Sequence, residues 1–156
     1  FILHMGPPMK NKVFNTPFET MLRILLLADV LGEPANIDRF AALDFICIYG
    51  KQCRVLDKNL HGNNELSFSE FTTKRTKVAE AIKLSVRNDF LTVENTQKGF
   101  EYSINNRGEQ IVGRLASSYA RSYQIGARIV NRKFHGLTDQ ELLQYISDKA
   151  SEKKGA

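Results

Sequence analysis

The sequence predicts a mostly α-helical protein with a small β-hairpin, in which a winged-helix-like domain is followed by a long C-terminal helix and a short last helix. Two observations support this prediction. A helical pattern that ends near Asn88 leads directly into two strand-like runs, residues 90–95 and 100–104, which alternate apolar and polar side chains. The turn between the runs contains Gly99, the residue type that a hairpin turn needs.

The first helix has the clearest start and end. Thr16, Pro17 and Glu19 form a capping box with proline at the first helical position, so we expect a helix from here to Gly32. Its apolar residues point in several directions and leave Arg23 almost alone on a polar face. We therefore expect it to be the central helix of the domain, covered on most sides.

Two further helices precede the hairpin. Asn36 is the expected cap of a second helix over residues 37–49, which Gly50 follows. After a long polar loop, Ser67 or Ser69 is the expected cap of the third helix. Helices followed by a hairpin are the expected order for a winged helix.

The chain divides into four parts. Residues 1–8 lack the basic and apolar regions of a secretion signal, and we interpret them as an artificial leader ahead of a native Met9. Residues 9–104 are the expected winged-helix-like domain. Residues 105–150 are the expected helical extension, in which one long amphipathic helix reaches about residue 134 and a short one is capped by the box that begins at Thr138. Residues 151–156 are expected to be a disordered tail.

The net charge of +5 equals the charge of residues 105–135, which contain six basic residues and one acid, and the remainder of the chain is neutral overall. Arg107, Arg114, Arg121 and Arg128 recur every seven residues, so on one continuous helix they would form a slowly drifting stripe. Such a stripe can follow a phosphate backbone, meet an acidic partner surface, or simply be solvated. The packing seam expected opposite the stripe consists of Val112, Leu115, Tyr119 and Val130, with Ile111 and Ile129 at its margin.

The outer face of the third helix is mixed. It carries Lys77 and Arg87, but Glu80 and Leu84 lie among them, and we expect Leu84 to be exposed. A base-reading helix presents basic and amide side chains there, so this mixture suits a protein contact better. We single out Lys77, Arg87 and Leu84 as candidate contacts to a partner or to nucleic acid.

Arg75 falls in the middle of the apolar face of the third helix. A buried charge requires a partner, so one hypothesis is an interior ion pair between Arg75 and either Asp44 or Asp29, which fall on the apolar faces of the other two helices. The alternative is that each charge extends to the rim of its apolar face.

The sequence contains no recognisable catalytic or cofactor motif. We find no phosphate-binding glycine loop, no nucleophile elbow and no metal-ligand spacing, and the loop around His61 is the only polar cluster that suggests a site. Cys47 and Cys53 lack paired spacing, which favours a reduced cytoplasmic compartment. No apolar run approaches the ~20 residues of a membrane span. We therefore expect no enzyme, no cofactor, no metal and no membrane partner.

Four blocks of sequence, residues 17–34, 42–50, 59–63 and 68–71, together resemble a known family. Their order and spacing are similar to those of the middle component of bacterial ABC-three-component systems, the small subunit of Lamassu-type defence operons. The similarity extends from about residue 13 to about residue 146.

The resemblance implies an accessory subunit with no activity of its own. Members of that family are encoded beside an SMC- or Rad50-like ATPase and, commonly, an effector such as a nuclease, so the implied role is to link ATPase to effector during defence against phage or plasmids. Non-specific contact with double-stranded DNA is a further possibility for the basic stripe. The alternative hypothesis is a stand-alone winged-helix transcription regulator, which would need to dimerise on a specific operator.

Overall fold

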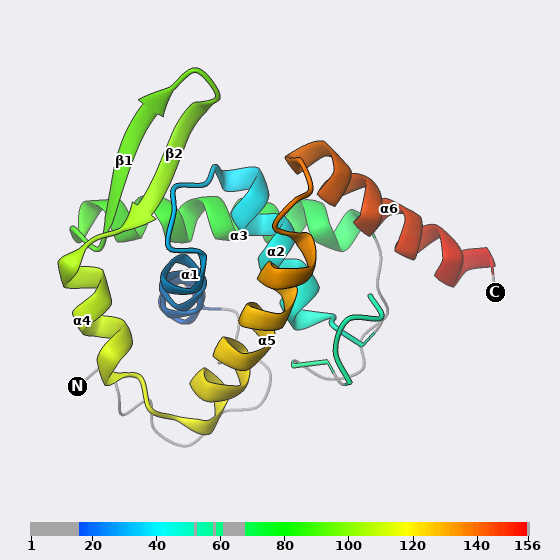
Figure 1. Cartoon of the computed structure of the whole chain (residues 1–156), viewed down its shortest axis with the longest axis horizontal. Coiled ribbons are helices and arrows are strands. Elements are labelled where there is room, and N and C mark those ends of the chain that lie inside the picture. The colour runs from blue at the N-terminus through cyan, green and yellow to red at the C-terminus, as the bar shows by residue number, and fades with distance from the viewer. Residues whose placement is uncertain (1–15, 52, 58, 61–67, 156) are drawn as a thin grey trace.

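The computed structural model describes residues 16–51, 53–57, 59–60 and 68–155 of the chain. These residues form six helices and one antiparallel hairpin, which confirms the predicted mostly α-helical class (Figure 1). The predicted leader, the cap at Ser67 and the His61 loop lie outside the described residues. The elements are α1 Pro17–Leu31, α2 Ile37–Ile48, α3 Phe68–Arg87, β1 Leu91–Thr96, β2 Gly99–Ile104, α4 Asn106–Arg114, α5 Ser118–Phe134 and α6 Asp139–Gly155.

The ends of α1 and α2 follow the predicted capping residues. The Thr16 hydroxyl accepts a hydrogen bond from the Glu19 amide at 3.1 Å, and Gly32 ends α1 with a left-handed φ of 65°. The Asn36 side chain accepts from the Arg39 amide at 2.8 Å and starts α2. Ser69, one of the two expected caps of α3, instead lies inside that helix.

The hairpin is confirmed, with strands that reach further toward the turn than we expected. Its register runs from Leu91 opposite Ile104 to Thr96 opposite Gly99, so only two residues form the turn. On its other side, β2 forms a one-residue bridge in which Tyr102 and Ala35 exchange two backbone hydrogen bonds, of 3.0 and 2.8 Å. The segment between α1 and α2 therefore lies beside the hairpin, in keeping with a winged-helix order of elements.

The prediction of one long helix over residues 105–134 is wrong, because this segment forms two helices, α4 and α5. Leu115 adopts an extended conformation, with ψ of 103°, and ends α4. Ser117 then caps α5 by accepting a hydrogen bond from the Ala120 amide at 3.1 Å. Serine favours a cap over a helix interior because its hydroxyl competes for backbone groups. The amphipathic pattern continued through this cap and concealed it.

The last helix begins as predicted but is longer. Thr138 and Glu141 cap each other reciprocally, with hydrogen bonds of 2.8 and 3.1 Å between the side chain of each and the amide of the other. We expected α6 to end near Asp148; the helix instead continues to Gly155. Its one buried face, with Leu142 and Ile146, packs against the rest of the chain.

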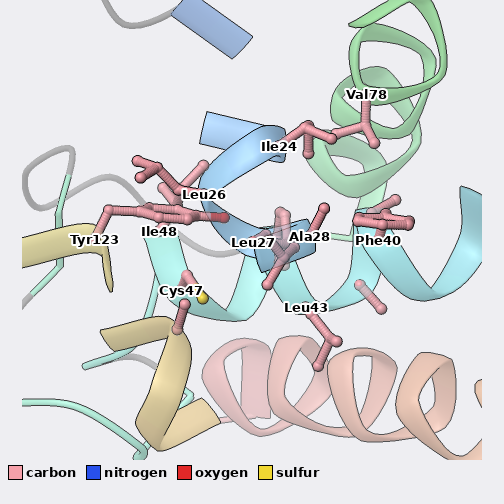
Figure 2. Close-up of a cluster of buried hydrophobic side chains, with 14 of the residues drawn as sticks. Ile24, Leu26, Leu27, Ala28, Phe40, Leu43, Cys47, Ile48, Val78 and Tyr123 are labelled. Carbon is pink, nitrogen blue, oxygen red and sulfur yellow. The ribbon is translucent and has the colours of Figure 1, made fainter. Parts of the chain in front are cut away.

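Helix α1 is the centre of the fold, as predicted, and contacts α2, α3, α4, α5 and β2. Figure 1 shows α1 almost along its axis, with α4 on one side and α2 and α5 on the other, while the hairpin projects away from the helices. Every residue from Thr20 to Ala28 is buried. Side chains from four helices meet in the cluster of Figure 2, among them Ile24, Leu27 and Ala28 of α1, Phe40 and Leu43 of α2, Val78 of α3 and Tyr123 of α5.

An ion pair lies inside this core and contains Asp44, as we hypothesised, but its cation is Arg23 and not Arg75. Arg23, expected on a polar face, has an exposed fraction of only 4% and donates to both carboxylate oxygens of Asp44, at 2.7 and 3.1 Å. Arg75 pairs with neither Asp44 nor Asp29; it binds Asp38 at 2.6 Å near the surface, where both side chains are about two-fifths exposed. The groups that act on Arg23 belong to other helices, Asp44 to α2 and Tyr119 and Tyr123 to α5, and a helical projection of α1 alone does not include them.

Tyr123 extends the buried pair to α5. Its hydroxyl donates to Asp44 at 2.7 Å. Burial alone would lower the pKa of Arg23, but the adjacent Asp44 carboxylate reverses this effect and raises it. The guanidinium is therefore charged at every physiological pH, and the three side chains join α1, α2 and α5 through charge-assisted hydrogen bonds.

Among the described residues, no helix has both the length and the apolar character required to cross a membrane.

We expect Asp44→Ala to lower the free energy of unfolding by about 3–5 kcal/mol, because it leaves the Arg23 charge buried without a counterion. Urea denaturation followed by circular dichroism measures the loss. The triple variant Arg23→Met, Asp44→Leu, Tyr123→Phe removes the whole polar cluster and should recover most of the stability.

The matched control is Arg75→Ala, which breaks a partly exposed pair and should cost less than about 1 kcal/mol. Equal losses of unfolding free energy from Asp44→Ala and Arg75→Ala would show that the buried Arg23–Asp44 pair stabilises the fold no more than a partly exposed pair.

Candidate partner-binding surface

The candidate residues on α3 are only partly where we expected them. Lys77 and Arg87 are exposed, and the exposed Glu80 lies between them, as predicted. Leu84, predicted to be exposed, is partly buried and packs against the core. The outer face of α3 therefore lacks the apolar contact that we proposed for it and is a polar surface of mixed charge.

The four arginines of the predicted stripe are divided between two helices. Arg107 and Arg114 belong to α4, and Arg121 and Arg128 belong to α5. Because Leu115 and Ser117 interrupt the helix, the seven-residue spacing no longer defines one continuous face.

Arg107 contributes to the packing of α4, although its side chain is 61% exposed. Its guanidinium lies 3.7 Å from the Asp89 carboxylate, donates to the Asn88 carbonyl at 3.5 Å and lies 5.6 Å from the centre of the Phe90 ring. These contacts attach the start of α4 to the turn between α3 and β1. Nearby, a side chain at Gly108 would clash with the Phe90 carbonyl, so the two segments are in direct contact.

Helix α5 carries the strongest positive surface of the described residues. Arg121, Arg128, Arg132 and Lys133 are exposed, and the helix contains no acidic residue. Spacings of seven and four residues place Arg121, Arg128 and Arg132 on one stripe of this helix. Two of the four predicted arginines, Arg121 and Arg128, thus share an exposed face with a third that the seven-residue repeat did not include.

Arg39 of α2 holds the C-terminal end of α5. It donates hydrogen bonds to the carbonyls of Phe134 at 2.9 Å and Leu137 at 2.8 Å, and pairs with Asp139 at 3.1 Å. The last carbonyls of a helix have no partner within the helix, so a cation is favourable there. Asn36 also donates to Asp139, at 2.7 Å. The end of α5 and the start of α6 are therefore fixed to the start of α2.

Two large apolar side chains are exposed among the cations of α5. Ile125 is 57% exposed and Ile129 is 40% exposed. Sequence analysis had placed only Ile129, at the margin of the packing seam, and had missed Ile125. Ile125 and Ile129 are four residues apart and lie among the basic residues of α5, and this spacing in the sequence indicates a second apolar row on the helix.

A pocket of about 340 Å³ lies beside the two isoleucines. Its walls are Val55, Leu56 and Leu60 from the segment after α2, and Ile125, Gly126 and Ile129 from α5; Cys47 and Tyr123 also line it. Since most of these side chains are apolar, the pocket suits an apolar group.

The chemistry of Cys47 and Tyr123 supports that assignment. Burial raises the pKa of the Cys47 thiol and that of the Tyr123 hydroxyl, and the Asp44 carboxylate adds to both effects. Both groups are therefore neutral at physiological pH, and Cys47 is not an activated nucleophile. Neither side chain therefore supplies a thiolate or a phenolate to this pocket.

A second hollow of about 590 Å³ separates α4 from α5. Arg121 and Arg128 line it from α5, whereas Glu109 lines it from α4 and Asp29 from α1. Ile125 lines this hollow as well as the apolar pocket, so it stands on the ridge between them.

Among the described residues, no three histidine, cysteine or acidic side chains are grouped as a metal site would require. His135 lies 3.0 Å from Glu33 at the surface.

Comparison with known proteins assigns the family. Residues 13–155 match the family described as ABC-three component (ABC-3C) system Middle Component 2. The match covers most of the chain, so this protein belongs to that family and is an accessory component of an ABC-three-component system. This confirms the resemblance to a middle component noted in the sequence. No curated protein and no solved structure shows significant similarity to the chain.

We expect Arg39→Met to release the junction between α5 and α6, because at least three backbone and carboxylate acceptors lose their cationic donor. Hydrogen–deuterium exchange should accelerate at residues 134–142, and the free energy of unfolding should fall by about 1–3 kcal/mol. Arg54→Met, which removes an exposed pair with Glu152, is the control and should leave that exchange unchanged. Unchanged exchange in both variants would contradict the role given to Arg39.

We also expect the protein to lose stability as the pH rises above about 8.5, where free thiols ionise. Burial raises the pKa of Cys53 to about 12 and that of Cys47 as well, so the folded state retains protons that the unfolded state releases. Urea midpoints at pH 7 and pH 9.5 measure the decrease. The double variant Cys47→Ala, Cys53→Ala should show a smaller decrease in the urea midpoint between the two pH values. A decrease equal to that of the unmodified protein would show that the thiols do not cause the loss of stability.

Proposed function

We propose that this protein is a non-enzymatic accessory subunit that links an SMC- or Rad50-like ATPase to an effector such as a nuclease, in defence against phage or plasmids. Membership of the Middle Component 2 family supports the proposal, since a middle component works together with other components. The observation that carries the linking role is the exposed pair Ile125 and Ile129 beside an apolar pocket on a basic helix. Apolar side chains exposed together around a pocket are typical of protein-binding sites.

A linking subunit requires a second surface, and the hairpin offers one. Val93 is 41% exposed and Phe100 is 59% exposed. The strand register puts Val93 opposite Tyr102 and Phe100 opposite Asn95, so all four side chains share one face of the hairpin. The buried Tyr102 packs on the core, whereas the apolar face continues beyond the core toward the tip. In Figure 1 the hairpin projects from the side of the molecule away from α5.

The proposal assigns the protein to the cytoplasm, in keeping with the free and buried thiols of Cys47 and Cys53.

The second candidate function is a stand-alone winged-helix transcription regulator, for which the exposed Lys77 and Arg87 on the helix before the hairpin are the supporting observation. Base reading requires donors and acceptors on that face, and Glu80 would oppose phosphate there. A dimer with a specific operator footprint would favour this function over the linking role.

The proposal expects an SMC- or Rad50-like ATPase and an effector to be encoded beside this protein, and coexpression with both tests the linking role. We expect the three proteins to purify as one complex, and the ATPase and effector to separate when this chain is omitted. The double variant Val93→Ser, Phe100→Ser should release one of the two partners and retain the other, because it alters the hairpin alone. An ATPase and effector that associate and protect cells equally well without this chain would exclude the proposal.

A further inference from the structure

We propose that the exposed face of α5 binds an acidic amphipathic helix of a partner protein, whose apolar side chains enter the pocket beside Ile125 and Ile129 and whose carboxylates pair with the arginines of α5. This inference rests on the proposed function and specifies the chemistry of one of its contacts.

The geometry of α5 suits a partner helix. Arg121, Ile125, Arg128 and Arg132 are separated by three or four residues and therefore follow one stripe of the helix. Ile129 lies beside this stripe, on the side that adjoins the pocket. A groove that receives an amphipathic helix needs a row of apolar sites at such spacings, and α5 together with Leu56 supplies it.

The charge of the surface selects an acidic partner. In the part of the chain that the structure describes, the guanidinium groups of Arg121, Arg128 and Arg132 form no ion pair and no hydrogen bond. Other exposed cations of the fold, such as Arg75 and Arg107, already have carboxylate partners. The three arginines are thus free to bind carboxylates in the two-oxygen geometry that arginine favours.

The apolar component argues against DNA as the occupant. A phosphate backbone uses cations and offers no partner for exposed isoleucines or an apolar pocket. Arg107 of α4, which a continuous stripe would have contributed, is held by Asp89 in the turn between α3 and β1.

A second copy of this chain is also disfavoured on this face. A two-fold dimer brings the same patch of both copies together. It would place the cations of one α5 against those of the other, with no acidic residue on either helix to compensate. A helix with leucines along one side and glutamates along its flanks satisfies both the pocket and the arginines.

The first test uses a defined probe. A fluorescein-labelled helical peptide with leucines at positions i, i+3, i+4 and i+7 and flanking glutamates should bind the full chain, as followed by fluorescence anisotropy. Ile125→Asp and Arg128→Glu should each weaken binding at least tenfold, and both positions are exposed, so the variants should fold normally by circular dichroism. Lys83→Glu makes the same charge change at an exposed position of α3 and should leave binding within twofold.

Three results of this test would overturn the inference. They are the absence of binding to the acidic peptide, equal binding of a peptide with lysine in place of every glutamate, and equal weakening by Arg128→Glu and Lys83→Glu.

The second test identifies the natural occupant. A photo-crosslinking amino acid in place of Ile125, in the complex coexpressed with the ATPase and effector, should form a crosslink to an acidic segment of one of them. Crosslinking to DNA or to a second copy of this chain would overturn the inference. Normal assembly of the complex with Ile125→Asp, together with no crosslink from the photo-crosslinking variant, would overturn it as well. If no complex assembles while the acidic peptide still binds α5, the linking function fails and the docking chemistry stands.

Discussion

The buried contact between Arg23, Asp44 and Tyr123 determines how the helices of this fold are arranged. Apolar packing of α1 against its neighbours tolerates small shifts along and around the helices, whereas two-oxygen pairing of a guanidinium with a carboxylate does not. One position on each of α1, α2 and α5 must meet at hydrogen-bonding distance. The cost of burying these charges limits the chain to arrangements in which all three are satisfied.

The position of the exposed face of α5 depends on this contact and on the hydrogen bonds that Arg39 donates at the C-terminal end of the helix. Tyr123 anchors α5 to α2 near its middle, and Arg39 anchors its C-terminal end. Both anchors lie on the inner side of α5 or at its end, so the outer side is left to carry arginines and isoleucines that contribute little to folding. Of these two anchors, Tyr123 also lines the apolar pocket, whereas Arg39 does not.

The sequence predicted the features that depend on a few neighbouring residues. The caps at Thr16, Asn36 and Thr138, the hairpin and the central position of α1 all follow from local patterns. The break at Ser117 was missed because periodicity continued on both sides of it, and local capping overrode the periodic pattern. The family resemblance came from ordered blocks and required no knowledge of contacts.

Features that depend on tertiary contacts could not be predicted in the same way. Asp44 was recognised as a charge in need of a partner, but the choice among Arg23, Arg75 and others depends on how helices cross. The pocket combines α5 with residues after α2 that are about seventy positions away in sequence. Ile125 has the same local pattern whether its helix face is covered or open, so its exposure becomes evident only from the packing around it.

The bridge between Ala35 and Tyr102 gives the hairpin a mechanical connection to the helices. Its two backbone hydrogen bonds join β2 to the segment between α1 and α2, while Gly108 brings α4 directly against Phe90 at the base of β1. A lateral load applied at the tip of the hairpin would therefore be shared between both of its strands and passed to α1, α2 and α4 together. The hairpin is consequently attached to the helices at two points, and a displacement of its base would require the central helices to move with it.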